Sequence, residues 1–262
     1  MRAGLMSLLF PPKCISCGTL FRFEGLGAEF PSLCQDCKRL WSSELLDTCS
    51  VCGKAISVCN CVPMELKRAG CVGYRKRVYY LQGKATAVQN RILYRIKHQP
   101  AARAVEFLAE ELSGALLEML FEAEVSRDEV VLVYLPRSHR SAAVNGTDQA
   151  KRLAEALSAR TGIQTYSAIR RRISRNQKQK KLTPQGRREN AKRAYVLCKN
   201  SDRSFLRGKS VVLIDDIVTT GATVAIGVCL LRKIGVKRVF ALSVAYDDVN
   251  KNAELRQPKF RI

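Results

Sequence analysis

The chain has 262 residues and a formal net charge of +22, so it is long enough for one or two domains with a substantial core. Such an excess of Lys and Arg favours a polyanionic partner, nucleic acid above all, with general basicity or affinity for small phosphates as the alternative. The apolar patch at residues 5–10 is too short to cross a membrane, and Pro11 and Pro12 follow it in place of a cleavage site, so we expect a cytoplasmic protein without membrane insertion.

Nine of the eleven cysteines lie within the first 71 residues, and eight of them form four close pairs. The pairs are Cys14/Cys17, Cys34/Cys37, Cys49/Cys52 and Cys59/Cys61. The first two pairs have the spacing C-x2-C-x16-C-x2-C, which is typical of a tetrahedral zinc site, and the last two pairs can form a second site. The pairing stays open at this point, because the first pair can also combine with the third.

We expect the metal to be structural Zn²⁺. A segment with so few large apolar residues needs a metal to fold, and four thiolates leave no open position for catalysis. A disulfide framework and an iron–sulfur cluster are the alternatives, and the lack of a secretion signal argues against the disulfides. The second cysteine pair opens a predicted helix at residues 33–45, with Leu40, Trp41 and Leu45 on one side.

Residues 72–80 combine three tyrosines with three basic residues in an alternating pattern. These residues are Tyr74, Arg75, Lys76, Arg77, Tyr79 and Tyr80. We expect an exposed strand that joins the cysteine-rich head to the rest of the chain. Its rings can stack on nucleic-acid bases, and a plain amphipathic strand is an equally good interpretation.

The remaining sequence alternates between helical and strand patterns, which predicts a doubly wound parallel α/β sheet. Helices are expected at 86–97, 101–124, 148–159 and 224–234, and strands at 129–136, 164–169, 211–217 and 239–246. The second helix carries an apolar stripe that we assign to the core: Val105, Leu108, Leu112, Leu116 and Met119. We expect His98 to end the first helix and not to bind a ligand.

Two basic segments follow strands of this sheet. The loop at 136–146 contains Arg137, Ser138 and His139, and its place after a strand predicts an anion site. His139 is a candidate general base, but a phosphate contact or a position in solvent is favoured. The run at 170–193 is more basic still, and can close over an anionic ligand or line a groove for single-stranded DNA. The expected nucleic-acid contacts are Arg170, Arg171, Arg172, Arg175, Lys178, Arg187 and Arg188.

Residues 211–223 read VVLIDDIVTTGAT, and the functional interpretation depends on them. The apolar run predicts a buried parallel strand, and Asp215 and Asp216 stand where it leaves the core. A small, hydroxyl-rich turn then leads to a helix start, where free backbone N–H groups favour a phosphate. The turn residues are Thr219, Thr220, Gly221, Ala222 and Thr223. Because carboxylates repel phosphate, the acids need sugar hydroxyls or Mg²⁺ as partners, unless they are merely solvated or cap the helix.

This stretch resembles the phosphoribosyl pyrophosphate (PRPP) motif of type I phosphoribosyltransferases. The resemblance implies that Asp215 and Asp216 contact the ribose hydroxyls, and that residues 219–223 surround the 5′-phosphate of PRPP bound with Mg²⁺. It also implies a pyrophosphate loop that contains Arg137 and Ser138, and a flexible basic loop whose cations stabilise departing pyrophosphate. Among these cations we assign Lys180 and Lys181 to catalysis.

Over nearly its whole length the chain resembles the ComF family of competence proteins. The similarity includes the cysteine head, the Q-x-x-L-T-x-x-x-R-x-x-N pattern at 179–190 and the DD-TTGAT stretch. It implies a role in natural transformation and DNA uptake, with single-stranded DNA, PRPP or another ribose phosphate, and other DNA-uptake proteins as partners. At 145–149 the chain reads NGTDQ where the family usually has RGFNQ, so an arginine is missing and Asp148 is added on the pyrophosphate side.

We therefore expect a cysteine-rich zinc-binding domain at 1–71, a basic linker and helix at 72–100, and a phosphoribosyltransferase-like domain at 101–262. Two functions follow as hypotheses. The first is a protein that binds single-stranded DNA and PRPP during transformation. The second is an active phosphoribosyltransferase whose acceptor, a nucleobase or a related metabolite, is unknown.

Overall fold

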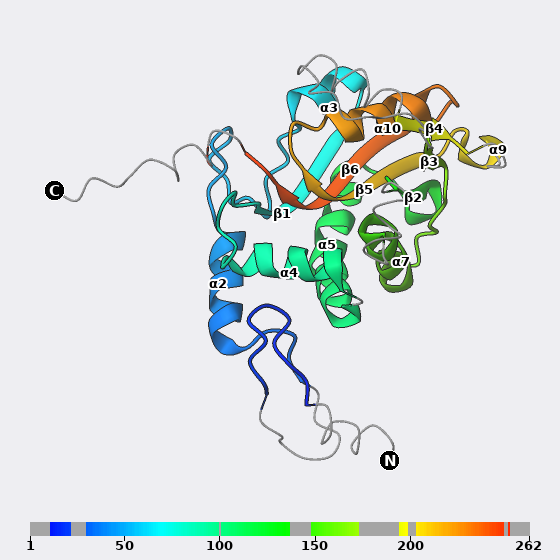
Figure 1. The fold of residues 1–262 in the computed structure, drawn as a ribbon. Coiled ribbons are helices and arrows are strands. Elements are labelled where there is room, and N and C mark those ends of the chain that lie inside the picture. Colours follow the sequence, from blue (N-terminus) through cyan, green and yellow to red (C-terminus); the bar gives the residue numbers. More distant parts are fainter. Residues whose placement is uncertain are drawn as a thin grey trace, which may run out of the picture.

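The computed structural model describes residues 11–21, 30–99, 101–136, 148–172, 194–198, 203–248 and 251. A four-stranded parallel sheet with the order β1-β6-β5-β2 forms its centre (Figure 1). The strands are β1 (Gly73–Tyr79), β2 (Val130–Tyr134), β5 (Ser210–Val218) and β6 (Arg238–Tyr246). The predicted parallel α/β fold is confirmed, and its two longest apolar strands, β5 and β6, occupy the middle of the sheet.

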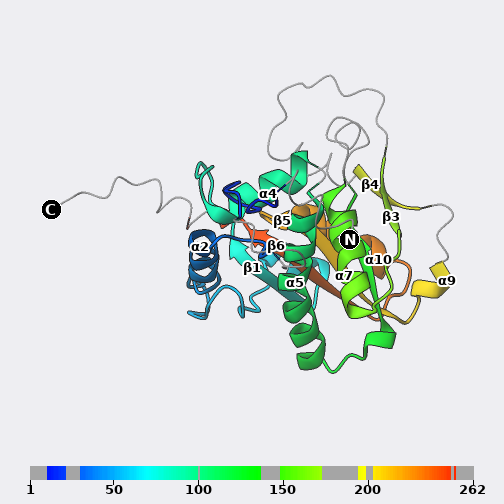
Figure 2. The ribbon, with the colours of Figure 1, turned by 90° about the horizontal axis from the view of Figure 1, so that it is seen from below.

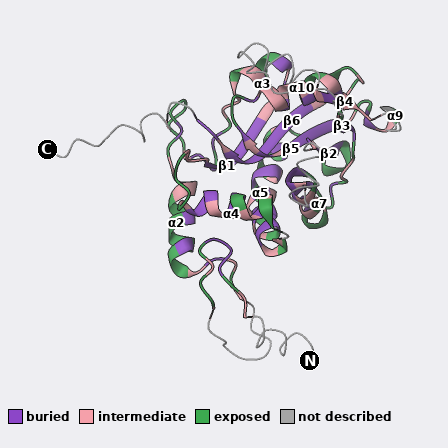
Figure 3. Cartoon of the chain, in the orientation of Figure 1, coloured by how far each residue is buried: buried purple, intermediate pink, exposed green. Residues whose placement is uncertain are grey.

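Helices cover both faces of this sheet (Figure 3). One face packs against α4 (Val88–His98), α5 (Ala102–Glu122) and α7 (Gln149–Thr161), and the other against α3 (Met64–Ala69) and α10 (Ala222–Arg232). The four helices expected in the body are thus present with shifted ends, and His98 ends α4 as predicted. All five residues of the predicted α5 stripe are buried.

A third parallel strand was expected at 164–169, and this prediction is wrong for most of its length. Thr165 makes a single parallel bridge to Leu132, and the chain then leaves the sheet. It continues into β3 (Ile169–Arg171), which pairs antiparallel with β4 (Tyr195–Leu197) in a separate two-stranded sheet. The run is too short both to extend the sheet and to pair with β4, so the bridge keeps only one pair of backbone hydrogen bonds with Leu132.

Strand β1 is not the exposed connection that its charges suggest. It pairs along its length with β6, and Arg75 and Lys76 are only 2% exposed. The Arg75 guanidinium forms an ion pair with Glu122 of α5, and Lys76 points into the cysteine-rich head. Stacking of nucleic-acid bases on Tyr74 and Tyr79 is excluded as well, because both rings are buried. Tyr74 lies in the core on the α10 side of the sheet, and Tyr79 lies in a small cluster with Cys49, Ile56 and Cys59 of the head.

The cysteine-rich head packs against this edge of the sheet. Its helix, α2 (Gln35–Leu45), buries Trp41 edge-to-face against Phe107 of α5, with ring centroids 5.2 Å apart. Leu40 was expected on the same side but is 50% exposed, since successive helical residues point about 100° apart.

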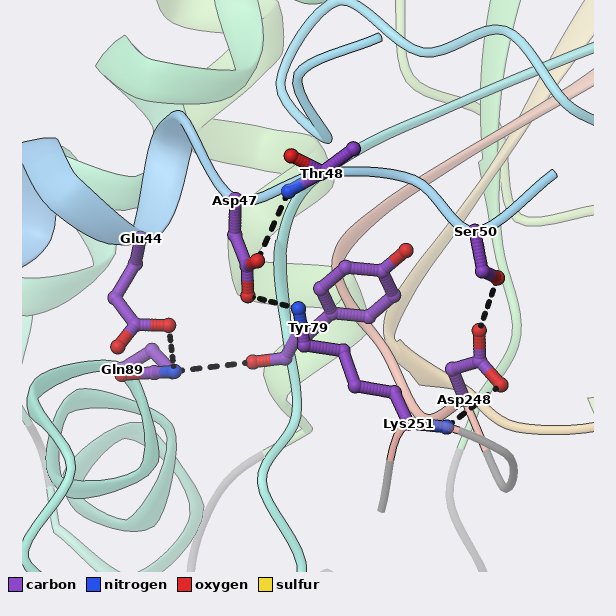
Figure 4. Close-up of polar contacts among 8 residues, drawn as sticks. All are labelled: Glu44, Asp47, Thr48, Ser50, Tyr79, Gln89, Asp248 and Lys251. Atoms are coloured by element: carbon purple, nitrogen blue, oxygen red, sulfur yellow. Dashed lines mark hydrogen bonds and ion pairs between the residues drawn. The ribbon is translucent and has the colours of Figure 1, made fainter. Parts of the chain in front are cut away.

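A polar network also joins the head to the sheet and the C-terminal segment (Figure 4). Gln89 of α4 donates its side-chain N–H to Glu44 at 2.7 Å and to the Tyr79 carbonyl at 3.2 Å. Lys251 forms an ion pair with Asp47, and Ser50 donates to Asp248 at 3.3 Å. These contacts hold the head in one position relative to β1 and α4.

Two short helical segments complete the described structure, η1 (Arg127–Glu129) and α9 (Arg203–Leu206). Among the helices of the described ranges, none combines the length and the apolar character that a membrane span requires.

Candidate functional site

The bend at residues 219–223 lies at the start of a helix, as the sequence predicts. Gly221 is the N-cap of α10 and has a φ of 81°, a left-handed conformation that favours glycine. A Cβ atom at this position would also lie 2.0 Å from Cδ1 of the buried Leu66. Glycine is therefore required here by its backbone conformation and by the close approach of α3.

Hydroxyl groups and a carboxylate surround this helix start. Asp215, Thr219, Gly221 and Thr223 line a small pocket of about 30 Å³. The Thr220 hydroxyl accepts a hydrogen bond from the Ala222 N–H at 3.3 Å. Since the first N–H groups of α10 have no partners within the helix, the pocket has donors for an anion.

The two acids lie within β5 and not beyond it, because the strand continues to Val218. They point to opposite faces of the sheet. Asp215 faces the pocket beside α10, whereas Asp216 faces α4, where its carboxylate lies 3.7 Å from the Lys97 ammonium. Each carboxylate also accepts a hydrogen bond from the next backbone N–H, at 2.9 Å for Asp215 and 2.8 Å for Asp216. These bonds fix both side chains at the carboxyl end of the strand.

The electrostatics of the pair favour a cation or hydroxyl donors. Burial raises the pKa of Asp215 well above its usual range, and the adjacent negative charge of Asp216 raises it further, while Lys97 acts in the opposite direction. An ionised Asp215 is therefore unfavourable unless a ligand stabilises it. Mg²⁺ and sugar hydroxyls both suit carboxylate oxygens in such a position.

Lys97 is a site residue that the sequence analysis did not identify. It lies in the last turn of α4, its ammonium lies 6.0 Å from the Tyr80 ring centroid, and its backbone carbonyl accepts a hydrogen bond from Gln149 at 3.0 Å. Gln149 opens α7 and is fully buried, so it ties this helix to the end of α4. The signal for Lys97 in the sequence was the Y-R-I-K-H segment at 94–98, which is part of the resemblance to the ComF family.

Most of the predicted site residues in the two basic segments lie outside the described residues. This holds for the loop residues Arg137, Ser138 and His139, and for Arg175, Lys178, Lys180, Lys181, Arg187 and Arg188. Arg170, Arg171 and Arg172 lie at β3, where the Arg171 guanidinium is 5.7 Å from the Tyr195 ring centroid. Asp148, the added acid, caps α7 by accepting a hydrogen bond from the Lys151 N–H at 3.2 Å.

The eight paired cysteines form two clusters. The sulfur atoms of each group of four lie within 4.8 Å of one another. The groups are Cys14, Cys17, Cys34 and Cys37, and Cys49, Cys52, Cys59 and Cys61. This arrangement confirms the pairing of neighbouring pairs and contradicts the interleaved one. All eleven cysteines are free thiols, which also contradicts a disulfide framework.

The sulfur positions fit a tetrahedral metal ion. A Zn–S bond of about 2.3 Å gives sulfur–sulfur separations of about 3.8 Å in a tetrahedron. Cys17 and Cys34 are 3.7 Å apart, and Cys52 and Cys59 are 3.5 Å apart. Each cluster could therefore bind one metal ion.

Without a metal, individual thiols of these clusters differ in their pKa. Burial raises the pKa of Cys37 and of Cys61 to about 12, with further contributions from neighbouring thiols. Burial acts in the same direction on Cys17, but hydrogen bonds with Thr19 outweigh it and lower the pKa of Cys17 to about 6. In the second cluster the buried Lys76 ammonium lies 3.0 Å from the Cys59 sulfur and 3.2 Å from the Cys61 carbonyl. This cation can offset the negative charge of metal-bound thiolates.

Comparison with known proteins agrees with this geometry. Residues 142–261, which contain the strand, the acids and the bend, match the family described as phosphoribosyl transferase domain. Competence protein F of Haemophilus influenzae is 32% identical over 108 residues, 41% of this chain and 46% of that protein. The chain is similar to a ComF-type competence protein, and residues 142–261 are similar to a phosphoribosyl transferase domain. It aligns with less than half the length of this curated relative.

Two solved structures are also similar. The purine phosphoribosyltransferase of Pyrococcus horikoshii is 18% identical with a TM-score of 0.30, and the match covers 53% of this chain and 74% of that one. The allosteric regulatory enzyme of purine biosynthesis is 15% identical with a TM-score of 0.32, over 60% of this chain and 38% of that one.

Proposed function

We propose that this ComF-like chain binds PRPP with Mg²⁺ at the carboxyl end of β5. The observation that carries the proposal is the bend at Gly221, which opens α10 directly beside the carboxylate of Asp215. A phosphate that binds the N–H groups of this helix start brings its ribose next to the acids. The hydroxyls of Thr219, Thr220 and Thr223 supply further donors.

The acids bind the ribose and the metal in this proposal. Asp215 accepts hydrogen bonds from ribose hydroxyls, which stabilises its ionised form. Asp216, whose charge Lys97 partly offsets, contributes a second carboxylate at the same strand end. Arg137 and Ser138 bind the pyrophosphate, and Lys180 and Lys181 offset its charge. These carboxylates would hold Mg²⁺, and the ion would supply positive charge that offsets the phosphates of PRPP.

The second part of the proposal is single-stranded DNA as a partner in transformation. A net charge of +22 supports a polyanionic ligand, and Competence protein F, the similar protein of Haemophilus influenzae, carries competence in its name. The proposed contacts are Arg170, Arg171, Arg172, Arg175, Lys178, Arg187 and Arg188. The chain acts in the cytoplasm and contacts other DNA-uptake proteins.

The cysteine clusters hold structural Zn²⁺ in this proposal. Four sulfur ligands saturate a tetrahedral ion, so the metal has no open position for a substrate. Its effect is to fix the head, which contacts β1 and α4. The folding of these loops then depends on the metal.

An active phosphoribosyltransferase is the second candidate function, because the acids and the bend of the PRPP motif are together in space. In the reaction an acceptor atom forms a bond to C1 of the ribose, and the bond from C1 to the pyrophosphate oxygen breaks. The pyrophosphate leaves with the electron pair, and the acceptor loses a proton to solvent or to a base. The missing arginine at 145 weakens the binding of this leaving group.

Titration calorimetry with PRPP and Mg²⁺ tests the proposed site. We expect binding by the wild type and at least a tenfold loss of affinity in Asp215→Asn, because Asn cannot stabilise the metal or accept as strongly from the ribose. Asp128→Asn is the matched control. Asp128 is an exposed acid in η1, just before the amino end of β2, whereas the proposed site is at the carboxyl end of β5. Equal affinities of the wild type and Asp215→Asn would refute the site. Product formation with candidate nucleobases would distinguish a transferase from a binding protein.

A further inference from the structure

A cleft of about 790 Å³ lies between the cysteine-rich head and α4. Residues of the turn in the first cysteine cluster, of the loop after β1 and of α4 line it. Figure 2 shows the turn, in dark blue, beside α4. Ser16 of this turn donates a hydrogen bond to the Val88 carbonyl at 3.4 Å, so the head is attached to the start of α4. Clefts of about 300–1,000 Å³ are typical of ligand sites.

The cleft is strongly cationic. Lys84, Arg91, Arg95 and Lys97 line it, and none of its described lining residues is acidic. Arg91 donates to the Thr86 carbonyl at 2.7 Å, which holds its guanidinium at the rim. Arg91 and Lys97 are separated by about 9 Å along the helix axis, so they can contact different phosphate groups. The arrangement fits an anion with several successive phosphates.

Aromatic rings lie among these cations. The Tyr94 and His98 rings are in contact in a tilted arrangement, with centroids 4.4 Å apart and an interplanar angle of 37°. Tyr94 is 61% exposed, so its ring is not needed for the core. A third ring, Tyr80, lies deeper in the same cleft beside Lys97. Flat rings next to cations stack on bases while the cations bind the backbone.

We propose that this cleft binds a short stretch of single-stranded nucleic acid. Phosphates contact Lys84, Arg91 and Arg95, and an unpaired base stacks on Tyr94. A duplex does not fit this chemistry, because its bases are already paired and stacked. The inference rests on the proposed function for its ligand class, and it adds a contact surface on α4 to the contacts proposed for the basic run at 170–193.

The position of Lys97 connects the cleft with the proposed PRPP site. Its ammonium lines the cleft and lies 3.7 Å from the Asp216 carboxylate. A strand that lies along α4 therefore reaches the carboxyl end of β5 from the face opposite to α10. The nucleic acid and the ribose phosphate would approach the same strand end from opposite faces of the sheet.

Fluorescence anisotropy with a labelled oligothymidylate tests the cleft. For single strands the slope of log affinity against log salt is about −0.7 for each phosphate contact, so Lys84→Gln with Arg95→Gln should reduce the slope by about 1.4. The charge-matched control is Lys67→Gln with Lys233→Gln, because both cations are exposed on the α3 and α10 side of the sheet. We expect this control to keep the wild-type slope.

The stacking contact is tested separately with Tyr94→Ala. Loss of one base stack should weaken binding by about five- to a hundredfold with an unchanged salt slope. Phe121→Ala is the control, since the Phe121 ring is 84% exposed on α5 and lies outside the cleft. Thermal unfolding of each variant checks that the fold is intact.

The outcomes separate the inference from the proposed function. If the wild type binds and the cleft variants have unchanged affinity and salt slope, the cleft is not the binding site, although single-stranded DNA remains a partner. Lack of binding by the wild type at 50 mM salt overturns both. Equal losses of affinity in the cleft and control variants also contradict binding in the cleft, because they show that the affinity depends only on the total charge.

Discussion

At the scale of single residues, Gly221 determines whether the phosphate-binding bend can form. Gly221→Ala should lower the free energy of unfolding by about 1–3 kcal/mol, because Ala is strained at a φ of 81° and its Cβ would displace Leu66. Gly114→Ala is the matched control. Gly114 lies within α5 with open space around it, so its replacement should stabilise the helix by up to about 1 kcal/mol. Denaturant unfolding measures both values, and an unchanged stability of Gly221→Ala would contradict the described bend.

Asp215 should destabilise the free protein at neutral pH. Burial and the charge of Asp216 raise the pKa of Asp215 in the folded state. The contribution of Asp215 to the free energy of unfolding is therefore favourable below its unfolded pKa of about 3.9, and it is lost as the pH rises through the folded pKa. Asp215→Asn should therefore raise Tm at pH 7, by about 2–4 °C for each kcal/mol of unfavourable ionisation removed, and this gain should shrink toward pH 4.

Thermal unfolding of Asp215→Asn between pH 4 and 8, without added Mg²⁺, checks this prediction, with Asp128→Asn as the control. A lower Tm than the wild type at pH 7 would mean that the carboxylate stabilises the fold. The same variant should lose PRPP affinity, so stability and binding are expected to change in opposite directions.

At the scale of elements, the cysteine clusters link the head to the sheet. We expect two zinc ions per chain, one of which is lost in Cys37→Ser and the other in Cys59→Ser, because each substitution removes one of four ligands. Cys229→Ser should keep both, since Cys229 is exposed on α10 and far from either cluster in sequence. Elemental analysis gives the metal content, and a zinc-free wild type that unfolds at the same temperature would contradict a structural metal.

Metal affinity should also fall as the pH is lowered. The thiols of Cys37 and Cys61 have pKa values raised to about 12 and are protonated at neutral pH, so each must release a proton when the metal binds. Each such proton weakens binding by about tenfold per pH unit. Competition with a chromophoric chelator between pH 6 and 8 measures this dependence, and an affinity independent of pH would contradict thiolate ligation.

The positions of helices and strands could be predicted from the sequence where the apolar pattern extends over many residues. The runs in β5 and β6 and the stripe of α5 specified buried elements directly. The charges of β1 were misleading, because the partners of Arg75 and Lys76 are Glu122 and the second cysteine cluster, which lie far away in the sequence. Local pattern cannot reveal such compensation, and for the same reason it did not indicate the pairing of Lys97 with Asp216.

At the scale of the whole molecule, the net charge of +22 should dominate interactions with nucleic acid. Affinity for a single-stranded oligonucleotide should fall by at least tenfold between 50 and 200 mM salt, because bound phosphates release counterions. Anisotropy titrations at several salt concentrations measure the slope. A salt-insensitive affinity in this range would exclude electrostatic binding.

The proposed function requires that the helix start at Gly221 holds the 5′-phosphate of PRPP while Asp215 binds its ribose. A crystal structure of the complex with PRPP and Mg²⁺ tests this most directly. We predict the phosphate within hydrogen-bond distance of the first N–H groups of α10, and a ribose hydroxyl at the Asp215 carboxylate. A ligand bound elsewhere, with Asp215 and the residues 219–223 free of contact, would contradict it.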